Sequence, residues 1–333
     1  MAQPIRIFLG DLTHNTVGMA NETFPLNVGY IAAYCKNRFG SKVEITIFKY
    51  IDDLEASIYE NPPDVLALSN YVWNHRIGLE MFDLIHSQNP NAITVWGGPN
   101  FPQDLESQQS FLKNYSNVDF YVPIEGEIGF SNIIEEVLKI SELGYKKEIL
   151  FKKPIDGCVS RKPDGLLQFT IPEIRTKKLD EIPSPYLTGL LDKFFDGKLT
   201  PMLQTNRGCP FTCTFCVDGA DTVNRVNQFG LGRVSSELNY IGEHVTSNIH
   251  SLHISDLNFG MYPRDLEICD GIVDIQKKYD YPHRVLSTTG KNKKERIIQA
   301  IEKLNGTMSL TMSVQSMDEQ ILRNIRRSNI SVD

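Results

Sequence analysis

The sequence lacks any long apolar run. No stretch approaches the roughly 20 consecutive apolar residues that a membrane-spanning helix needs, and residues 1–6 lack the apolar region of a secretory signal peptide. Cysteine is also sparse, because six cysteines in 333 residues are too few for a disulfide scaffold. We therefore expect a protein without a membrane span that works in the reducing environment of the cytoplasm.

Positive charge is not in excess either. The net charge of -7 argues against a nucleic-acid partner, and the basic run at 291–294 is interpreted as the solvated start of a helix. No Gly-x-Gly-x-x-Gly motif follows the first expected strand, which disfavours a nicotinamide or flavin site. The chain is long enough for about two domains, and 41% hydrophobic residues can build their cores.

The first 145 residues alternate short apolar segments with amphipathic ones. Strands are expected at Ile5–Leu9, Val43–Phe48, Val65–Ser69, Thr94–Trp96 and Asp119–Val122. Helical spacing follows, for example over 27–38 and in the apolar stripe of Ile77, Met81 and Ile85. This α/β alternation with short connections predicts a Rossmann-like, doubly wound parallel sheet.

Ligands of such sheets bind beyond the carboxyl ends of the strands. The loops that should line this rim are 11–15, 69–73, 97–100 and 125–127. Glycine at Gly97, Gly98 and Gly126 would allow the backbone to approach a large flat ligand closely.

The region after residue 145 changes in composition. We expect a linker at 146–200, with a hairpin at the Pro-Asp-Gly turn of 163–165 and a stiff Pro-Ser-Pro-Tyr connector at 183–186.

Four strand-and-helix units are then expected over 201–333. Their strands are Met202–Thr205, Ser251–Ser255, Val285–Thr288 and Met308–Val314. The second and fourth alternate apolar and polar residues, so a helix layer on the apolar face would turn the polar face toward the lumen of a partial barrel. Two half-exposed strands are the alternative.

Three cysteines, Cys209, Cys213 and Cys216, lie in one short loop after an apolar run. Their thiolates can hold one compact metal centre, but they leave one coordination position open. A structural zinc site has four protein ligands. The next cysteine along the chain, Cys269, lies in an expected amphipathic helix and is interpreted as a small buried hydrophobic residue. A cluster with one open iron fits best, and a zinc-stabilised binding module that recruits a fourth ligand is the alternative of another class.

The spacing Cys-x3-Cys-x2-Cys, with Phe215 before the third cysteine, resembles the radical S-adenosylmethionine (SAM) enzymes. The resemblance implies a 4Fe-4S cluster that binds SAM at its open iron and cleaves it reductively to a 5′-deoxyadenosyl radical. It assigns SAM contacts by position, although the family's common Gly-Gly-Glu form is absent. The residues assigned in this way are Phe215, Asp256, Asn258, Ser313 and Gln315.

Upstream, residues 25–34, Trp-Gly-Gly-Pro at 96–99 and Glu-Gly-Glu at 125–127 resemble the cobalamin-binding domain that precedes many radical SAM domains. The resemblance places cobalamin against the loops at the strand ends. The expected contacts are Thr13, His14, Asn70, Tyr71, Gly97, Gly98, Glu125, Gly126 and Glu127.

One departure from the cobalamin pattern concerns His14. Domains that ligate cobalt through histidine use Asp-x-His-x-x-Gly, and here the spacing differs by one residue on each side of His14. Whether His14 ligates cobalt or is an ordinary loop histidine is left open at this point. Without that ligand, Tyr71 or Trp73 could pack against the lower face of cobalt.

For the intact enzyme the resemblance implies a cobalamin-dependent radical SAM methyltransferase acting on an unactivated carbon. A rearrangement or oxidative cyclisation without methyl transfer is the alternative within that class. The organic substrate is not readable from the sequence, and an electron donor such as flavodoxin or ferredoxin is expected. The barrels of this family usually continue through two more strands, so we expect the chain to be an N-terminal fragment.

Overall fold

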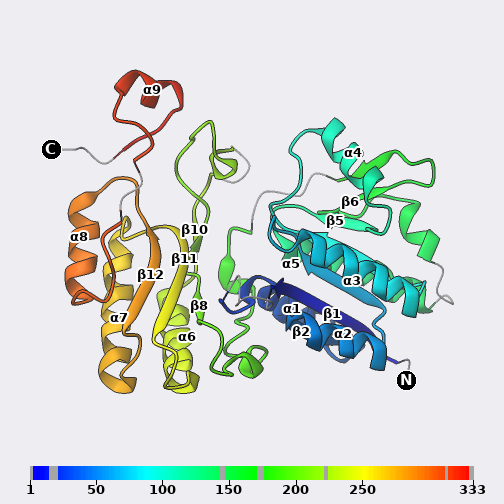
Figure 1. Ribbon diagram of the computed structural model, residues 1–333, viewed down its shortest axis with the longest axis horizontal. Helices are drawn as coiled ribbons and strands as arrows, with labels where there is room; N and C mark the ends of the chain where they lie inside the picture. The colour runs from blue at the N-terminus through cyan, green and yellow to red at the C-terminus, as the bar shows by residue number, and fades with distance from the viewer. Residues whose placement is uncertain are drawn as a thin grey trace. The chain divides into compact units, whose positions relative to one another are not determined.

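The computed structural model describes residues 3–14, 22–142, 147–170, 176–220, 224–311 and 314–329. The chain divides into two compact units, residues 1–173 and 174–333 (Figure 1). The predicted hairpin therefore belongs to the N-terminal unit, and the Pro-Ser-Pro-Tyr connector belongs to the C-terminal one. No helix within the described ranges is long and apolar enough to cross a membrane.

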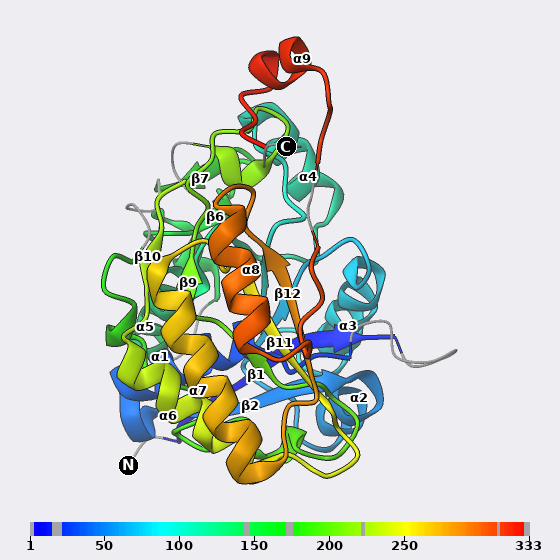
Figure 2. The same cartoon turned by 90° about the vertical axis from the view of Figure 1, so that its left-hand side faces the viewer.

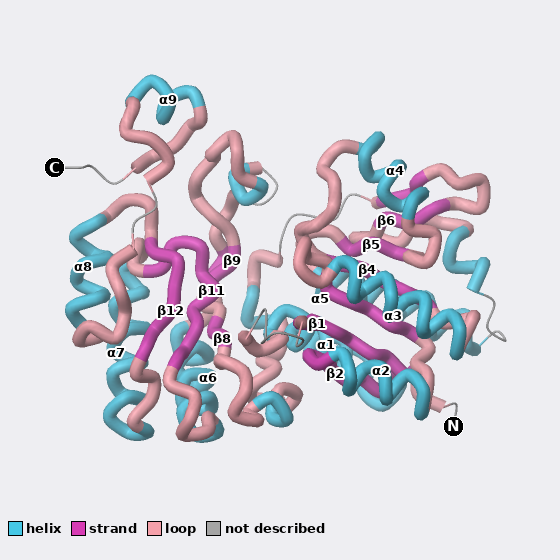
Figure 3. Tube along the Cα trace, in the orientation of Figure 1, coloured by secondary structure: helices cyan, strands magenta, loops and turns pink. Residues whose placement is uncertain are grey.

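The N-terminal unit is built on one sheet, in the order β2-β1-β3-β4-β5-β6-β7 (Figure 3). The parallel strands are β1 (Ile5–Thr13), β2 (Val43–Tyr50), β3 (Val65–Ser69), β4 (Ile93–Gly97) and β5 (Phe120–Val122). The hairpin strands β6 (Val159–Arg161) and β7 (Leu167–Phe169) extend this sheet in antiparallel fashion. The predicted doubly wound parallel sheet is confirmed.

The helices of this unit cover both faces of its sheet. The chain moves from β1 to β2 in one direction and from β3 to β5 in the other, so right-handed crossovers put their helices on opposite faces. The first face carries α1 (Leu26–Phe39) and α5 (Gly126–Glu142), which contact each other. The second carries α2 (Ile51–Glu60), α3 (His75–Gln88) and α4 (Leu105–Asn114), over a core that includes Ile58, Phe82, Trp96 and Leu112.

The C-terminal unit contains a smaller parallel sheet in the order β12-β11-β8. Its strands are β8 (Met202–Leu203), β11 (Ser251–Phe259) and β12 (Arg284–Thr289). The helices α6 (Leu231–His244), α7 (Pro263–Tyr279) and α8 (Lys294–Lys303) pack in a row along it (Figure 2). A short antiparallel pair, β9 (Asn206–Arg207) and β10 (Asn227–Gln228), and the helix α9 (Glu319–Asn324) complete the described elements.

Five short 3-10 helices join these elements. They are η1 (Gly40–Lys42), η2 (Lys147–Phe151), η3 (Leu179–Glu181), η4 (Asp192–Phe194) and η5 (Val217–Gly219) among the described residues. The connector is fixed by Tyr186, whose buried hydroxyl donates to the Met202 carbonyl at 2.8 Å. The connector thus anchors β8 within the C-terminal unit.

Alternation along β11 agrees with the sequence. Leu252 and Ile254 are fully buried, whereas Ser251, His253 and Ser255 are half-buried. Cys269 is buried in α7, where burial raises the pKa of its thiol to about 12, as expected of a small core side chain.

The prediction of a fourth strand in this unit, Met308–Val314, is wrong for the residues that the structure describes. Only Met308 pairs, through an isolated bridge to Val285, while 309–311 and Val314 have no strand conformation. Leu310 and Val314 are each 48% exposed. Ile325, the residue after the following helix α9, accepts a hydrogen bond from Thr214 N in the cysteine loop. This segment therefore lacks the helical cover that makes an alternating strand stable.

Candidate functional site

The three cysteines lie between β9 and η5. Cys209 and Cys213 are buried and Cys216 is exposed. The loop turns through hydrogen bonds from Cys216 N to Cys213 O, at 3.2 Å, and from Gly219 N to Cys216 O, at 3.0 Å. A Cβ atom at Gly219 would collide with the backbone of Cys213, which explains the glycine there. Local turns therefore gather all three thiols in one loop.

Two of the three sulfur atoms face N–H donors. Asn258 Nδ2 lies 3.4 Å from Cys209 Sγ, and Arg327 Nη1 lies 4.0 Å from Cys213 Sγ. Sulfur in this setting accepts hydrogen bonds, which suits the thiolate ligands of an iron-sulfur cluster. In the part of the chain that the structure describes, no group of three or more His, Cys, Asp or Glu side chains is arranged to hold a metal ion. The fit to a cluster thus rests on the donor set and its hydrogen-bond partners.

Asp256 holds the segment that leads into the cysteine loop. Its Oδ1 accepts from the backbone N–H groups of Thr205 and Asn206 at 2.8 and 3.2 Å, and its Oδ2 accepts from Asn206 Nδ2 at 2.7 Å and from the Thr205 hydroxyl. Burial raises the pKa of Asp256 to about 7, although these donors act in the opposite direction. Asp256 therefore ties β11 to β9, and its predicted contact with SAM stays a prediction.

The other predicted SAM contacts are less closely gathered. Asn258 lies beside Cys209, as described above, while Phe215 and Gln315 are exposed. Ser313 lies outside the described residues. The roles of all four toward SAM stay predictions.

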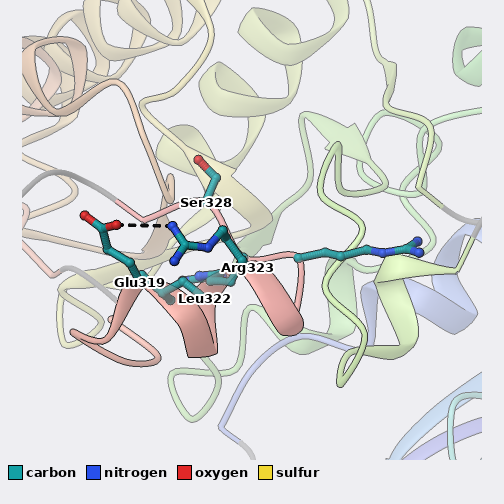
Figure 4. Close-up of a pocket in the computed structure, with 6 residues that line it drawn as sticks. Glu319, Leu322, Arg323 and Ser328 are labelled. Atoms are coloured by element: carbon teal, nitrogen blue, oxygen red, sulfur yellow. Dashed lines mark hydrogen bonds and ion pairs between the residues drawn. The ribbon is translucent and has the colours of Figure 1, made fainter.

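A hollow lies beside α9 (Figure 4). It has a volume of about 440 Å³ and is lined by Glu319, Leu322, Arg323, Arg326, Arg327 and Ser328. Arg323 pairs with Glu319 at 3.2 Å. Arg327 is the lining residue that also contacts Cys213.

In the N-terminal unit, Asn70 joins the loops after β3 and β4. Its backbone N–H donates to Gly97 O at 2.6 Å and its Nδ2 to Asn100 O at 3.1 Å. Its Oδ1 lies 3.0 Å from His75 Nδ1, and Tyr121 OH donates to Gly98 O at 2.8 Å. Asn70 is completely buried, so its amide holds the rim rather than lying open on it.

The rim glycines are closely packed against other atoms of the protein. Gly98 has φ +123°, and a Cβ atom there would lie 2.9 Å from Asn70 O. A Cβ atom at Gly126 would collide with the Ile31 side chain, and one at Gly97 would lie 3.3 Å from Val122 O. Close approach of a ligand to these glycines stays a prediction.

An aromatic ledge, which we define as Tyr71 and Trp73, lies after β3. The two rings stack with centroids 4.5 Å apart, and Trp73 is 43% exposed. His14 lies 2.7 Å from the Trp73 carbonyl through Nε2. A carbonyl oxygen only accepts, so His14 Nε2 donates in this contact. Ligation of cobalt by His14, through Nδ1, stays a prediction.

The remaining rim residues lie at the ends of β1 and β5. Thr13 is fully buried, and Glu127 is buried in the first turn of α5. Glu125 and Gly126 are half-buried. Ile124, just before them, has φ +66°, a strained conformation for a β-branched residue that holds the turn between β5 and α5.

Sequence reasoning missed a buried charge network beneath this rim. Lys49 Nζ pairs with Asp11 Oδ2 at 3.0 Å, Ser69 Oγ donates to Asp11 Oδ1 at 2.5 Å, and Asn74 Nδ2 donates to Ser69 Oγ at 3.0 Å. The signal was an aspartate and a lysine of opposite charge just after two expected strands, which the structure extends to include both residues.

The basic run at 291–294 leads into α8 as expected, with Lys293 exposed at the N-cap, but Lys291 is not fully solvated. Lys291 is half-buried and precedes α8, and its Nζ donates to Asn258 Oδ1 at 2.8 Å. The polar partner at the end of β11 explains why this lysine turns inward.

Comparison with known proteins gives each unit a counterpart. The B12 binding domain family matches residues 15–134 of the N-terminal unit, and the cysteine loop lies in the C-terminal one. The chain is similar to radical SAM proteins that depend on cobalamin.

Curated relatives agree with this class. The chain is 30% identical over 281 residues to the cobalamin-dependent radical SAM methyltransferase TokK of Streptomyces tokunonensis, covering 81% of this chain and 39% of TokK. It is 29% identical over 293 residues to 2-(S-pantetheinyl)-carbapenam-3-carboxylate methyltransferase of Streptantibioticus cattleyicolor, covering 85% of this chain and 40% of that protein. It thus spans about two fifths of the length of these relatives.

Solved structures show the same fold. The cobalamin-dependent SAM radical enzyme OxsB, with aqua-cobalamin and SAM bound, matches 98% of this chain and 46% of its own, with a TM-score of 0.66 at 17% identity. The radical SAM methyltransferase TsrM of Kitasatospora setae, with cobalamin and a [4Fe-4S] cluster bound, matches 85% of this chain and 53% of its own, with a TM-score of 0.57 at 13% identity.

Proposed function

We propose that this chain acts in a cobalamin-dependent radical SAM methyltransferase that methylates an unactivated carbon of an organic substrate. The observation that carries the proposal is the loop of Cys209, Cys213 and Cys216, with N–H donors at two of its sulfur atoms. The two curated relatives named as methyltransferases support the type of reaction.

In this proposal each cysteine of the loop binds one iron of a 4Fe-4S cluster, and the fourth iron is left to SAM. The bound cofactors supply reductive cleavage of SAM and a methyl group carried by cobalamin. The residues of the chain hold these groups: Asp256 fixes the approach to the cysteine loop, and the aromatic ledge offers an apolar surface to cobalamin.

Two further expectations belong to this proposal. A low-potential electron donor such as flavodoxin or ferredoxin would reduce the cluster. The cytoplasm is the expected location, since thiols that serve as cluster ligands must stay reduced.

A rearrangement or oxidative cyclisation without methyl transfer is the second candidate. It is favoured by 25% identity over 287 residues to 4'-phospho-dehydrooxetanocin synthase of Priestia megaterium, which covers 78% of this chain and 36% of that protein. Once a substrate is found, the products of SAM separate the candidates. Methyl transfer to an unactivated carbon releases S-adenosylhomocysteine together with 5′-deoxyadenosine, whereas radical chemistry without methyl transfer releases 5′-deoxyadenosine and no S-adenosylhomocysteine.

Anaerobic reconstitution of the chain with iron, sulfide and cobalamin tests the proposal. We expect about four irons per chain together with bound cobalt, and loss of the iron in each of Cys209→Ala, Cys213→Ala and Cys216→Ala. Cys269→Ala is the matched control, because it removes a buried cysteine outside the loop. One tightly held zinc and no iron-sulfur cluster would instead support the zinc-stabilised module, and absence of bound corrinoid would remove methyl transfer.

A further inference from the structure

A short chain of polar contacts reaches Cys209 from the interior of the C-terminal unit. Lys291 Nζ lies 2.8 Å from Asn258 Oδ1 and 3.3 Å from the Leu257 carbonyl. Asn258 Nδ2 lies 3.4 Å from Cys209 Sγ. Asn258 is 2% exposed. Because bulk water cannot replace these partners, the loss of either hydrogen bond would leave a buried polar atom without a partner. The ammonium group also lies 5.6 Å from the ring centre of Phe211, inside the cysteine loop.

Lys291 determines which way the Asn258 amide points. An ammonium group only donates hydrogen bonds, so the amide atom that faces it must be the oxygen. The NH2 group of Asn258 is then turned toward Cys209, where it donates to sulfur. The pair therefore presents an oriented N–H group to one cluster ligand, with a positive charge behind it.

We propose that Asn258 and Lys291 form a positioning pair that raises the reduction potential of the cluster through a hydrogen bond to the Cys209 sulfur. Reduction adds negative charge to the cluster and its sulfur ligands, and a directed N–H group stabilises the reduced form more than the oxidised one. The inference rests on the proposed cluster but goes beyond it, because it assigns residues that set how readily the cluster accepts an electron. It also gives Asn258 a role that does not require SAM.

The test is an optical redox titration of the reconstituted chain without SAM. Asn258→Asp keeps the shape, removes the N–H donor and adds a negative charge. Lys291→Met keeps the amide and removes the cation that orients it. We expect both variants to retain iron. At the wild-type midpoint potential, their ratio of reduced to oxidised cluster should fall about tenfold, the size expected for one hydrogen bond to a charged group.

Two controls accompany the titration. Asn248→Asp changes an exposed asparagine before β11, whose Nδ2 donates to Gly197 O at 2.7 Å, and it should leave the midpoint unchanged. Lys291→Arg keeps a donor and a positive charge, and it should restore most of the wild-type midpoint. Asn258→Ala removes the same N–H donor without adding a charge and should shift the midpoint in the same direction, and it replaces Asn258→Asp if that variant does not keep a cluster.

Wild-type midpoints in both Asn258→Asp and Lys291→Met would overturn the inference. A shift in Lys291→Met alone would do so as well, since it would show a charge effect that needs no amide. A role of Asn258 in SAM binding only would weaken SAM binding and leave the SAM-free midpoint unchanged. If the wild-type chain forms no cluster, the proposed function itself fails, which is a distinct result.

Discussion

The two units prepare their candidate sites in different ways. In the N-terminal unit the polar groups of the rim bond to one another, with Asn70 joining Gly97 and Asn100. In the C-terminal unit, Asn258 and Arg327 direct N–H groups at cysteine sulfurs. Hydrogen bonds within the protein therefore hold the N-terminal rim. In the C-terminal unit the N–H groups point at cysteine sulfur atoms, which can also bind a metal.

Two buried aspartates, one beside each candidate site, also differ in their partners. Asp11 pairs with Lys49 beneath the N-terminal rim. Asp256 accepts hydrogen bonds from uncharged N–H and O–H groups of Thr205 and Asn206. The N-terminal rim should therefore depend on an internal ion pair, and the approach to the cysteine loop on hydrogen bonds from uncharged donors.

The largest expected effect is on the ion pair. Lys49→Met leaves the Asp11 carboxylate buried without its cation, so the N-terminal unit should lose about 3–5 kcal/mol of unfolding free energy. Both tryptophans of the chain, Trp73 and Trp96, lie in this unit, and their fluorescence in urea reports its unfolding selectively. The control is Lys42→Met, at an exposed lysine. A loss below about 1 kcal/mol, as for a surface pair, would show that the rim does not depend on this pair.

The next effect is a pH dependence of the C-terminal unit. Burial raises the pKa of Asp265 from 3.8 to about 6, so the folded form keeps a proton that the unfolded chain has lost. This contribution to stability is full below pH 3.8 and is lost as the pH rises through about 6. Asp265→Asn removes it, and the stability difference between variant and wild type should change by up to about 3 kcal/mol in favour of the variant between pH 4 and pH 8. Circular dichroism in urea measures this change, and parallel pH curves for both proteins would contradict it.

Asp256→Ala tests the hydrogen bonds that Thr205 and Asn206 donate to this carboxyl group. The change leaves the buried N–H groups of Thr205 and Asn206 without their acceptor, which should cost about 2–3 kcal/mol. Because these residues lead into the cysteine loop, the variant should also bind less iron on reconstitution. Asp274→Ala, at an exposed position on α7, is the control. Normal iron content in a destabilised Asp256→Ala protein would separate Asp256 from the assembly of the loop.

The smallest effect concerns the rim backbone. Gly98→Ala introduces a Cβ atom at φ +123° and 2.9 Å from Asn70 O, which should cost about 1–3 kcal/mol. Gly165→Ala is the matched control, because its φ is also positive but nothing lies within 4 Å of the added atom. Cobalamin affinity, followed by absorbance, should fall more in Gly98→Ala than in the control. Equal affinities would show that this part of the rim does not determine cobalamin binding.

The sequence predicted the elements whose signal is local. The parallel strands of the N-terminal sheet are apolar runs bounded by turn residues, and the three cysteines of the loop are close in sequence, so both were visible. The bond between Lys291 and Asn258 joins residues 33 positions apart, and no local pattern encodes it. The prediction of a strand at 308–314 was wrong over its described part. It relied on alternating apolar and polar residues, and this pattern does not reveal whether a neighbouring helix covers the apolar face.

The central claim is that the cysteine loop holds a cluster with one iron open to SAM. The most direct measurement is electron paramagnetic resonance of the reduced, reconstituted chain before and after addition of SAM. The account predicts a 4Fe-4S signal that changes on SAM binding and is absent from Cys213→Ala. A reduced cluster whose signal is the same with and without SAM, or a chain that holds only zinc, would contradict it.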